Sequence, residues 1–316
     1  MIVAFITKRL LFGVITLFII SALVFFGTEI LPGDVAQAIL GQNATPELVA
    51  QMRDRLGLDA PIMTRFFNWM LKLSTGDLGT SLASGTDIGA ELSLRLMNTV
   101  ILSGVTVLIS VPTAIALGVW AVNRPGGLVD RTVSGISLTL ISFPDFLIAV
   151  LLVSVFAVGL GWLPAIASIK PSYTFIDWVR VLILPVTALT LSVLAHMVRM
   201  TRAAILSVLS SPSIEMAVLK GIPRRRILFR HALPNAAGPI VNVVALNIVY
   251  LVSGVVVIES LFNFPGVGRY MVEGVTNRDV PVVQVCAIIF CSAYVLTNLL
   301  ADAIAVLLNP RARYPK

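Results

Sequence analysis

Charge is scarce in this chain of 316 residues: Asp, Glu, Lys and Arg make up 12% of it, hydrophobic residues make up 57%, and the mean hydropathy is +0.96. An ordinary soluble domain is about 25% charged and 45–50% apolar. So few charges cannot cover a water-soluble globule, and a disordered chain would need far fewer hydrophobic residues. The composition therefore excludes both classes and indicates an integral membrane protein.

The residues that hold metals, disulfides and nucleotides are scarce as well. The two cysteines, Cys286 and Cys291, lie in one apolar run, without the spacing of a disulfide framework or a metal site. His196 has no second histidine, cysteine or acid near it in the sequence. The phosphate-binding pattern Gly-x4-Gly-Lys-Ser/Thr does not occur. We therefore expect no catalytic residue, no metal and no cofactor on this chain.

Long uncharged windows predict six membrane-spanning helices, because about 20 residues at 1.5 Å each cross a hydrocarbon layer of roughly 30 Å. The windows are Leu10–Thr28, Leu96–Asn123, Thr132–Ile169, Val181–Val198, His231–Ile258 and Val280–Ala301. The third window is interrupted by Asp145 and contains Pro144, which predicts one helix followed by a re-entrant segment or loop. The first window is longer than the 7–15 residues of a secretory signal, so it reads as a span.

Basic residues set the orientation. With both termini inside, the inner segments hold fourteen of the 23 Lys and Arg residues and the outer segments hold nine, five of which lie in the long first outer segment. Positive charge gathers on the cytoplasmic side, and long outer loops cross regardless of their charge. The sequence predicts a multi-pass membrane protein with both termini in the cytoplasm.

The predicted organisation has four parts. Residues 1–30 form the cytoplasmic N-terminus and first span, and residues 31–95 a small helical periplasmic segment. Within that segment Thr45, Pro46 and Gly57 are the start and stop signals of one helix, and a second helix is expected from Pro61. Residues 96–308 form a five-helix core with a cytoplasmic loop at 199–233, and residues 309–316 a cytoplasmic tail.

The cytoplasmic loop contains the signals of a very short helix: Ser213 as cap, Glu215 in the first turn, Lys220 in the last and Gly221 as stop. Arg224, Arg225 and Arg226 follow it. One interpretation is an interfacial loop whose charges keep it in the cytoplasm. The other is a docking helix, because so short a helix is not stable alone in water and needs something to pack against.

The spacing in this loop resembles the EAA loop of the permeases of ABC importers. Glu215, Ala217, Gly221, Leu233 and Pro234 match that pattern, whereas Met216 and His231 depart from it. Further stretches are similar to the dipeptide/oligopeptide/nickel branch of the family. They are Leu31–Asp34, Leu56–Pro61, Gly76–Ser81, Ile258–Gly268, Arg278–Pro281 and Asn309–Arg313, where Asn309 replaces an aspartate.

The resemblance implies a six-helix type I ABC importer fold with a definite set of partners. These are a second, related six-helix permease, two cytoplasmic ATP-binding subunits that hold ATP and magnesium, a periplasmic solute-binding protein and the lipid bilayer, with no nucleic acid. It implies a transport subunit rather than an enzyme, most simply for peptides or peptide-like solutes, with nickel chelates, glutathione, opines or saccharides as alternatives. The residues that would contact the ATP-binding subunits are Glu215, Ala217, Lys220, Gly221, Arg224 and Arg225.

Other residues are candidates for the pathway or its gate. An ionisable group inside a membrane is a functional candidate by default, which applies to Asp145 beside Pro144. The alternatives are a structural hydrogen bond at the proline break or a place near the outer boundary of the membrane. Glu259 ends the fifth span, and the turn after it contains Phe262, Pro265 and Gly266. A gate or docking contact is one interpretation, and an interfacial carboxylate that fixes the turn is the other.

Two rival classes were weighed. Asp145 and Asp302 could suggest an intramembrane aspartyl protease, but we expect Asp302 to be structural, paired with Arg311 or Arg313. A stand-alone secondary transporter would need coupling acids at mid-membrane and an internal repeat, and the sequence shows neither a repeat nor a second such acid.

Overall fold

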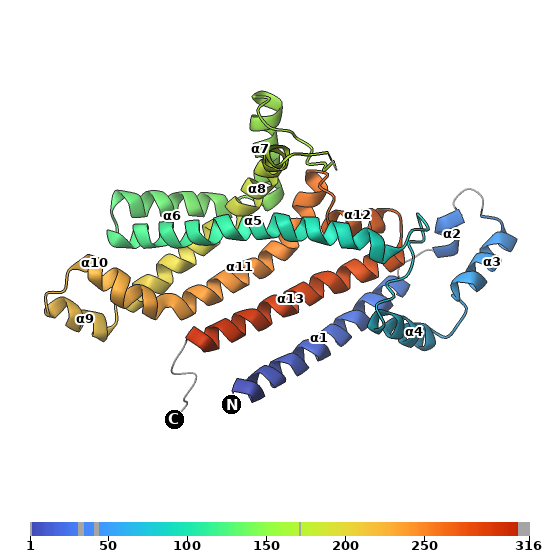
Figure 1. Cartoon of the computed structure of the whole chain (residues 1–316), viewed down its shortest axis with the longest axis horizontal. Coiled ribbons are helices and arrows are strands. Elements are labelled where there is room, and N and C mark those ends of the chain that lie inside the picture. The colour runs from blue at the N-terminus through green and yellow to red at the C-terminus, as the bar shows by residue number, and fades with distance from the viewer. Residues whose placement is uncertain (1, 31–34, 41–43, 171, 309–316) are drawn as a thin grey trace. The chain divides into compact units, whose positions relative to one another are not determined.

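The computed structural model describes residues 2–30, 35–40, 44–170 and 172–308, and these parts are helical with no strand. Figure 1 shows the helices in chain order. They are α1 (Ile2–Ile30), α2 (Val35–Leu40), α3 (Pro46–Leu56), α4 (Ile62–Ser74), α5 (Ile88–Asn123), α6 (Leu128–Ile141), α7 (Asp145–Leu152), α8 (Phe175–Leu209), α9 (Pro212–Leu219), α10 (Arg224–Arg226), α11 (Leu233–Leu261), α12 (Val267–Thr276) and α13 (Val280–Leu308). The motifs at 31–34 and 309–313 lie outside the described residues.

Five continuous stretches are long and apolar enough to cross a membrane, and a bent helix pair makes a sixth. The five are Thr7–Ile30, Ile88–Asn123, Phe175–Leu209, Arg224–Leu261 and Val280–Ile304. The all-helical, six-span prediction is therefore confirmed. The fifth span starts earlier than expected, because the arginine cluster is already helical and a π-helical turn (Ile227–Ala232) carries it into α11.

The third window contains two helices joined at a sharp bend, either a broken span or a re-entrant segment. The re-entrant alternative of the prediction is compatible with this arrangement, and the second part is helical rather than a plain loop. α6 and the stretch Asp145–Gly159 meet at an angle of 102°. Pro144 causes the break: it has an extended backbone (φ −61°, ψ 145°), and a proline disfavours helical conformation in the residue before it. Its carbonyl then accepts a bond from Leu147 N (2.9 Å), which starts α7.

The chain forms two compact units. One comprises residues 1–10, 100–264 and 294–316, and the other residues 11–99 and 265–293. In the first unit α8 is the central helix and packs against α6, α7 and α11. Its core includes Leu184, Leu189 and Met197, each about 1% exposed.

Two ion pairs join helices within the first unit. Arg202 of α8 donates to both carboxylate oxygens of Asp130 in α6, at 2.6 and 2.8 Å, and Gly126 N donates to the same carboxylate at 2.8 Å. Asp130 is 3% exposed. Asp302 pairs with Arg9 (2.9 Å), whereas its expected partners at 311 and 313 lie outside the described residues.

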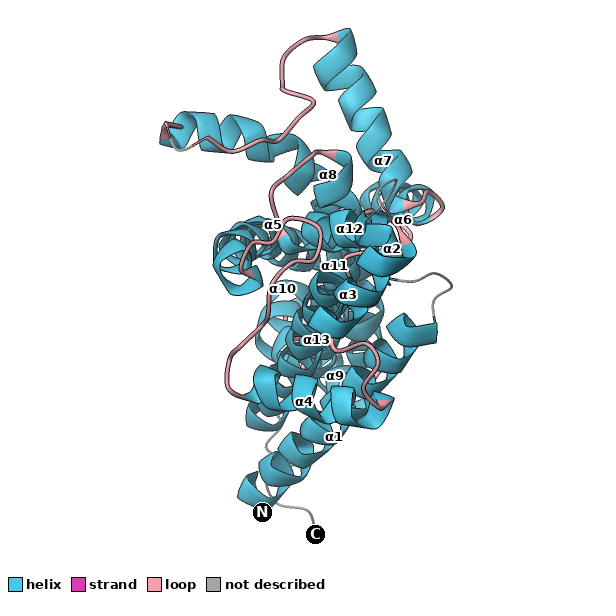
Figure 2. Cartoon of the chain, turned by 90° about the vertical axis from the view of Figure 1, so that its right-hand side faces the viewer, coloured by secondary structure: helices cyan, strands magenta, loops and turns pink. Residues whose placement is uncertain are grey.

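In the second unit the predicted helices of the first outer segment are present. α3 has Thr45 as its N-cap, whose hydroxyl accepts from Leu48 N, and Gly57 ends it with φ 63°. α4 begins after Pro61 and buries Phe66 against Phe18, Phe25 and Phe26 of α1. Figure 2 shows these helices joined by loops.

A buried carboxylate fastens the loop before α5 to the turn before α13. Asp279 is 3% exposed and accepts bonds from Ser81 Oγ, Leu82 N (3.1 Å) and Ala83 N (3.2 Å). Three donors satisfy most of the acceptor sites of one carboxylate. The Arg278–Pro281 stretch is therefore a structural clamp within this unit.

We expect Asp130→Asn to lower the free energy of unfolding by about 2 kcal/mol, because it leaves the Arg202 guanidinium without its anion at a site largely removed from water. Thermal unfolding in detergent measures the change. Asp59→Asn is the matched control, since it breaks an exposed pair with Arg53 and should cost less than about 0.5 kcal/mol. Equal losses from the two variants would contradict the structural role of the Asp130–Arg202 pair.

Candidate functional site: the α9 helix and the pocket at Asp145

The short cytoplasmic helix predicted from Glu215 and Gly221 is present as α9. It begins earlier than expected: Ser211, not Ser213, is the N-cap residue, and Pro212 is the first helical residue. Gly221 has φ 73° and its N–H donates to Val218 O (2.9 Å). This left-handed conformation is costly for a residue with a Cβ, so Gly221 ends the helix as predicted.

α9 has a buried and an exposed side. Ile214 and Ala217 are 4% and 9% exposed and pack with Ile227, which follows α10. Ala217 was expected to face a partner; in the structure its small side chain permits close packing of α9 on its own chain. Glu215 and Lys220 are exposed, as expected for docking residues.

Three apolar side chains beside Glu215 were missed by the sequence analysis. Met216, Val218 and Leu219 are 55%, 58% and 75% exposed. Eight residues that are apolar on nearly every side leave some side chains without a neighbour once one side is packed. The departure from the family pattern at Met216 was a signal that could have identified this surface.

The two arginines predicted to contact a partner differ in their surroundings. Arg224 Nη2 donates to the carbonyl of Val122 at the end of α5 (3.2 Å), so it fastens α10 to its own chain. Arg225 is exposed. Both arginines are exposed, and Arg224 is in addition bonded to its own chain.

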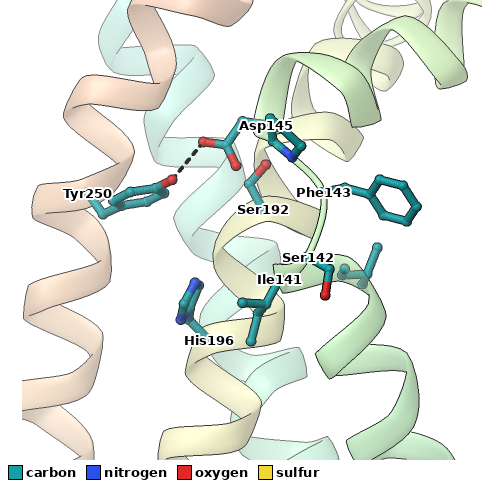
Figure 3. Close-up of a pocket in the computed structure, with 9 residues that line it drawn as sticks. Ile141, Ser142, Phe143, Asp145, Ser192, His196 and Tyr250 are labelled. Atoms are coloured by element: carbon teal, nitrogen blue, oxygen red, sulfur yellow. Dashed lines mark hydrogen bonds between the residues drawn. The ribbon is translucent and has the colours of Figure 1, made fainter.

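The break in the third span opens a pocket of about 290 Å³ in the first unit. Figure 3 shows that its walls come from the α6–α7 break, from α8 and from α11. The lining residues are Leu140, Ile141, Ser142, Phe143, Pro144, Asp145, Ser192, His196 and Tyr250. Asp145 and Pro144, both predicted as pathway residues, thus lie in one pocket.

Asp145 is held at the pocket wall by two interactions. The Tyr250 hydroxyl of α11 donates to Asp145 Oδ2 at 3.0 Å (Figure 3). Asp145 is also the first residue of α7, and the N-terminus of a helix favours negative charge. Ser192 and His196 lie one turn apart on α8, and the His196 and Tyr250 rings are 6.4 Å apart.

The other predicted pathway residues do not line this pocket. Glu259 and Phe262 are both 0% exposed and lie in the interior of the first unit. Asn263 has φ 56° and Phe264 N donates back to Glu259 O (2.8 Å), so the chain turns sharply and buries both residues. In this structure Glu259 and Phe262 are therefore interior residues at a turn, and their role as a gate or docking contact stays a prediction.

Pro265 and Gly266 begin the second segment of the second unit, residues 265–293. The Pro265 carbonyl accepts a bond from Asn98 Nδ2 (2.8 Å), and Gly266 is the N-cap residue of α12. Both positions serve to start α12 and to fix it to α5 within that unit.

Two family models match the chain along almost its whole length. Residues 114–314 match the binding-protein-dependent transport system inner membrane component, and residues 2–114 match the N-terminal region of the same kind of membrane component. The chain therefore belongs to the family of binding-protein-dependent transport system inner membrane components.

Curated relatives agree with this assignment. A probable peptide ABC transporter permease protein, y4tP of Sinorhizobium fredii, and the glutathione transport system permease protein GsiC of Escherichia coli K12 are each 36% identical over 310 residues. The match covers 98% of this chain and 99% of each relative. The protein is thus a permease subunit of an ABC importer.

Solved structures share the fold. An inward-facing form of the MetNI methionine ABC transporter superposes with a TM-score of 0.57 at 19% identity, over 69% of this chain and 96% of the matched chain. A second crystal form of the same transporter gives a TM-score of 0.51. The matched part of this chain therefore has the fold of a type I ABC importer permease.

Phe262→Ala should lower the free energy of unfolding by about 3 kcal/mol, since it removes a fully buried aromatic side chain from a packed core. Thermal unfolding in detergent is again the measurement. Phe146→Ala, at a position 52% exposed, should cost less than about 1 kcal/mol. A stable Phe262→Ala variant with altered transport would contradict the core placement and favour the gate interpretation.

Proposed function

We propose that this chain forms half of the translocation pathway of an ABC importer for peptides or peptide-like solutes. The proposed assembly pairs it with a second, related six-helix permease. Two cytoplasmic ATP-binding subunits dock beneath the pair and supply ATP hydrolysis, and a periplasmic solute-binding protein delivers the solute. The family and the names of the relatives support this assembly.

The orientation proposed is a bacterial inner membrane location with both termini in the cytoplasm. The excess of Lys and Arg in the segments that this orientation places inside supports it. The arginines of α10 and the Asp130–Arg202 pair would then lie near the cytoplasmic surface, where charged groups retain water.

The observation that carries the coupling role is the two-sided packing of α9. Its buried residues anchor it to the chain, which gives an eight-residue helix the support that it lacks alone. Its other side presents Met216 and Leu219 next to the charged Glu215 and Lys220. An apolar centre with charged neighbours is the composition of a protein–protein contact.

Motion of α9 would reach the pocket through the helices to which it is joined. α9 contacts the end of α8 and the π-helical turn that starts α11. Those two helices pack along each other and carry Ser192, His196 and Tyr250 of the pocket. Closure of an ATP-binding subunit on α9 would thus shift two walls of the pocket together, as in rigid-body switching.

Peptides are preferred as the solute because relatives over the full chain length are named for a peptide and for glutathione, itself a peptide-like compound. Nickel chelates, opines and saccharides remain alternatives for the same architecture. Uptake measured with a binding protein encoded beside this permease decides among them.

Glu215→Gln and Leu219→Asp should each reduce uptake and solute-stimulated ATP hydrolysis at least about tenfold, the equivalent of about 1.4 kcal/mol at the α9 contact. Both side chains are exposed, so folding should be preserved. Affinity of the binding protein for its solute should not change. Leu128→Asp is the matched control: Leu128 is 84% exposed at the start of α6 and should keep coupling within twofold of wild type.

Gly221→Pro should abolish coupling, because proline fixes φ near −65° where the chain needs 73° and removes the N–H that Val218 O accepts. Gly57→Pro provides a close comparison: Gly57 has φ 63° and its N–H donates to Asp54 O at the end of α3. Uptake in vesicles should be lost in the first variant only. Normal uptake by Gly221→Pro would count against the docking role of α9.

A further inference from the structure

We infer that the pocket at the α6–α7 break binds the primary ammonium group of the solute during translocation, with Asp145 as its counter-ion. This inference rests on the proposed function and specifies which chemical group of the solute this chain contacts. Four features of the pocket support this inference. They are the carboxylate of Asp145, the position of the pocket within the membrane-spanning helices, the absence of lysine and arginine from its lining residues, and the size of the pocket.

The anion is Asp145, and the structure keeps it in place for a ligand. Tyr250 Oη donates to one carboxylate oxygen. A carboxylate has about four acceptor sites, so one hydrogen bond leaves room for more donors. The ion pairs among the described residues do not include Asp145, and an ionised group inside a membrane protein normally has a partner. A solute cation would supply it.

The pocket lies within the membrane-spanning helices. Ser192 is near the midpoint of the 35-residue α8, and Tyr250 is near the middle of the 29-residue α11. Pro144 interrupts the third span beside them, and non-helical backbone within a span is tolerated where it lines a water-filled cavity or is buried in protein. Asp145 therefore lies at a break within the spans, where a carboxylate needs a partner.

The remaining pocket walls favour a cation over other ligands. The C-terminal end of α6, at Leu140 and Ile141, is the negative end of that helix. Ser192 donates its proton to Ala188 O at 3.1 Å, which leaves its oxygen lone pairs as acceptors.

The size of the pocket suits one end of a peptide, and its ligand set does not suit a metal ion. A volume of about 290 Å³ is at the lower end for a small-molecule site, enough for one end of a peptide. Among the described residues no group of three or more His, Cys, Asp and Glu side chains could hold a metal. An ammonium group, with three N–H donors, fits a single carboxylate and neighbouring neutral acceptors.

The test uses the whole importer in proteoliposomes, with its binding protein outside and ATP inside. The probe is an equimolar library of tri- and tetrapeptides with free or acetylated amino termini, and mass spectrometry reports what accumulates. We expect Asp145→Asn to reduce accumulation of free-amine peptides at least tenfold, and Asp145→Glu to restore part of it. Accumulation by Asp145→Asn within twofold of wild type would overturn the inference.

A second pair of variants keeps the test independent of whether Asp145→Asn assembles. His196→Lys places a tethered ammonium group in the pocket at an exposed position, and His196→Gln is its uncharged control. The lysine variant should lose uptake of free-amine peptides at least tenfold relative to the glutamine variant. Equal uptake by the two would overturn the inference.

The library also separates this inference from the proposed function. If the wild-type importer accumulates no peptide, the peptide assignment fails, and the inference fails with it. If the wild type accumulates free-amine peptides and all the pocket variants do so equally, the inference alone fails and the proposed function stands.

Discussion

The break at Pro144 is the constraint on which the rest of the site depends. A bilayer requires each backbone donor and acceptor to be satisfied within the protein, so a span is normally one uninterrupted helix. Here α6 stops, the chain turns by 102°, and α7 restarts with Asp145 at its first position. The same break creates the pocket and aims a carboxylate into it. Without Pro144 the third span could continue as one helix, and Asp145 would then lie on the lateral surface of that helix rather than at the start of a new one.

Support for that break comes from α8 and α11. Tyr250 of α11 holds the carboxylate, and α8 supplies Ser192 and His196 on the facing side. Both helices extend to the cytoplasmic loop, where α8 leads into α9 and the arginine cluster leads into α11. The pocket and the proposed docking surface are therefore two ends of the same pair of helices. These two helices are a physical route that couples the docking surface to the pocket. The route requires only that the helices are rigid and have two alternative arrangements.

Much of this architecture could be predicted from the sequence. The six spans follow from charge spacing, and the helix at Thr45–Gly57 follows from its capping residues, because both signals are local. The α9 helix was recognised from an acid, a base and a glycine within nine residues. Pro144 was recognised as an interruption, but a proline does not reveal whether the chain re-enters as a loop or as a second helix, since packing against α8 decides that.

Long-range packing explains what the sequence did not reveal. Glu259 and Phe262 lie at the end of a span, a position that favours the surface, yet the turn at Asn263 buries both in the core. Asp302 pairs with Arg9, nearly three hundred residues away in the chain. From the sequence alone we expected a partner close to it, Arg311 or Arg313. Arg224 bonds to α5, and Ala217 faces its own chain, because the side of α9 that packs is fixed by the residues after α10. Each case depends on which segments meet in space.

The measurement that tests the account most directly is purification of the tagged full chain from its native membrane in mild detergent, with identification of every protein that accompanies it. The account predicts two cytoplasmic ATP-binding subunits and a second six-span permease in stoichiometric amounts, and loss of the ATP-binding subunits in a Leu219→Asp variant. A chain that purifies alone or only with copies of itself, with no ATP-binding subunit under the same gentle conditions, would contradict the proposed coupling through α9.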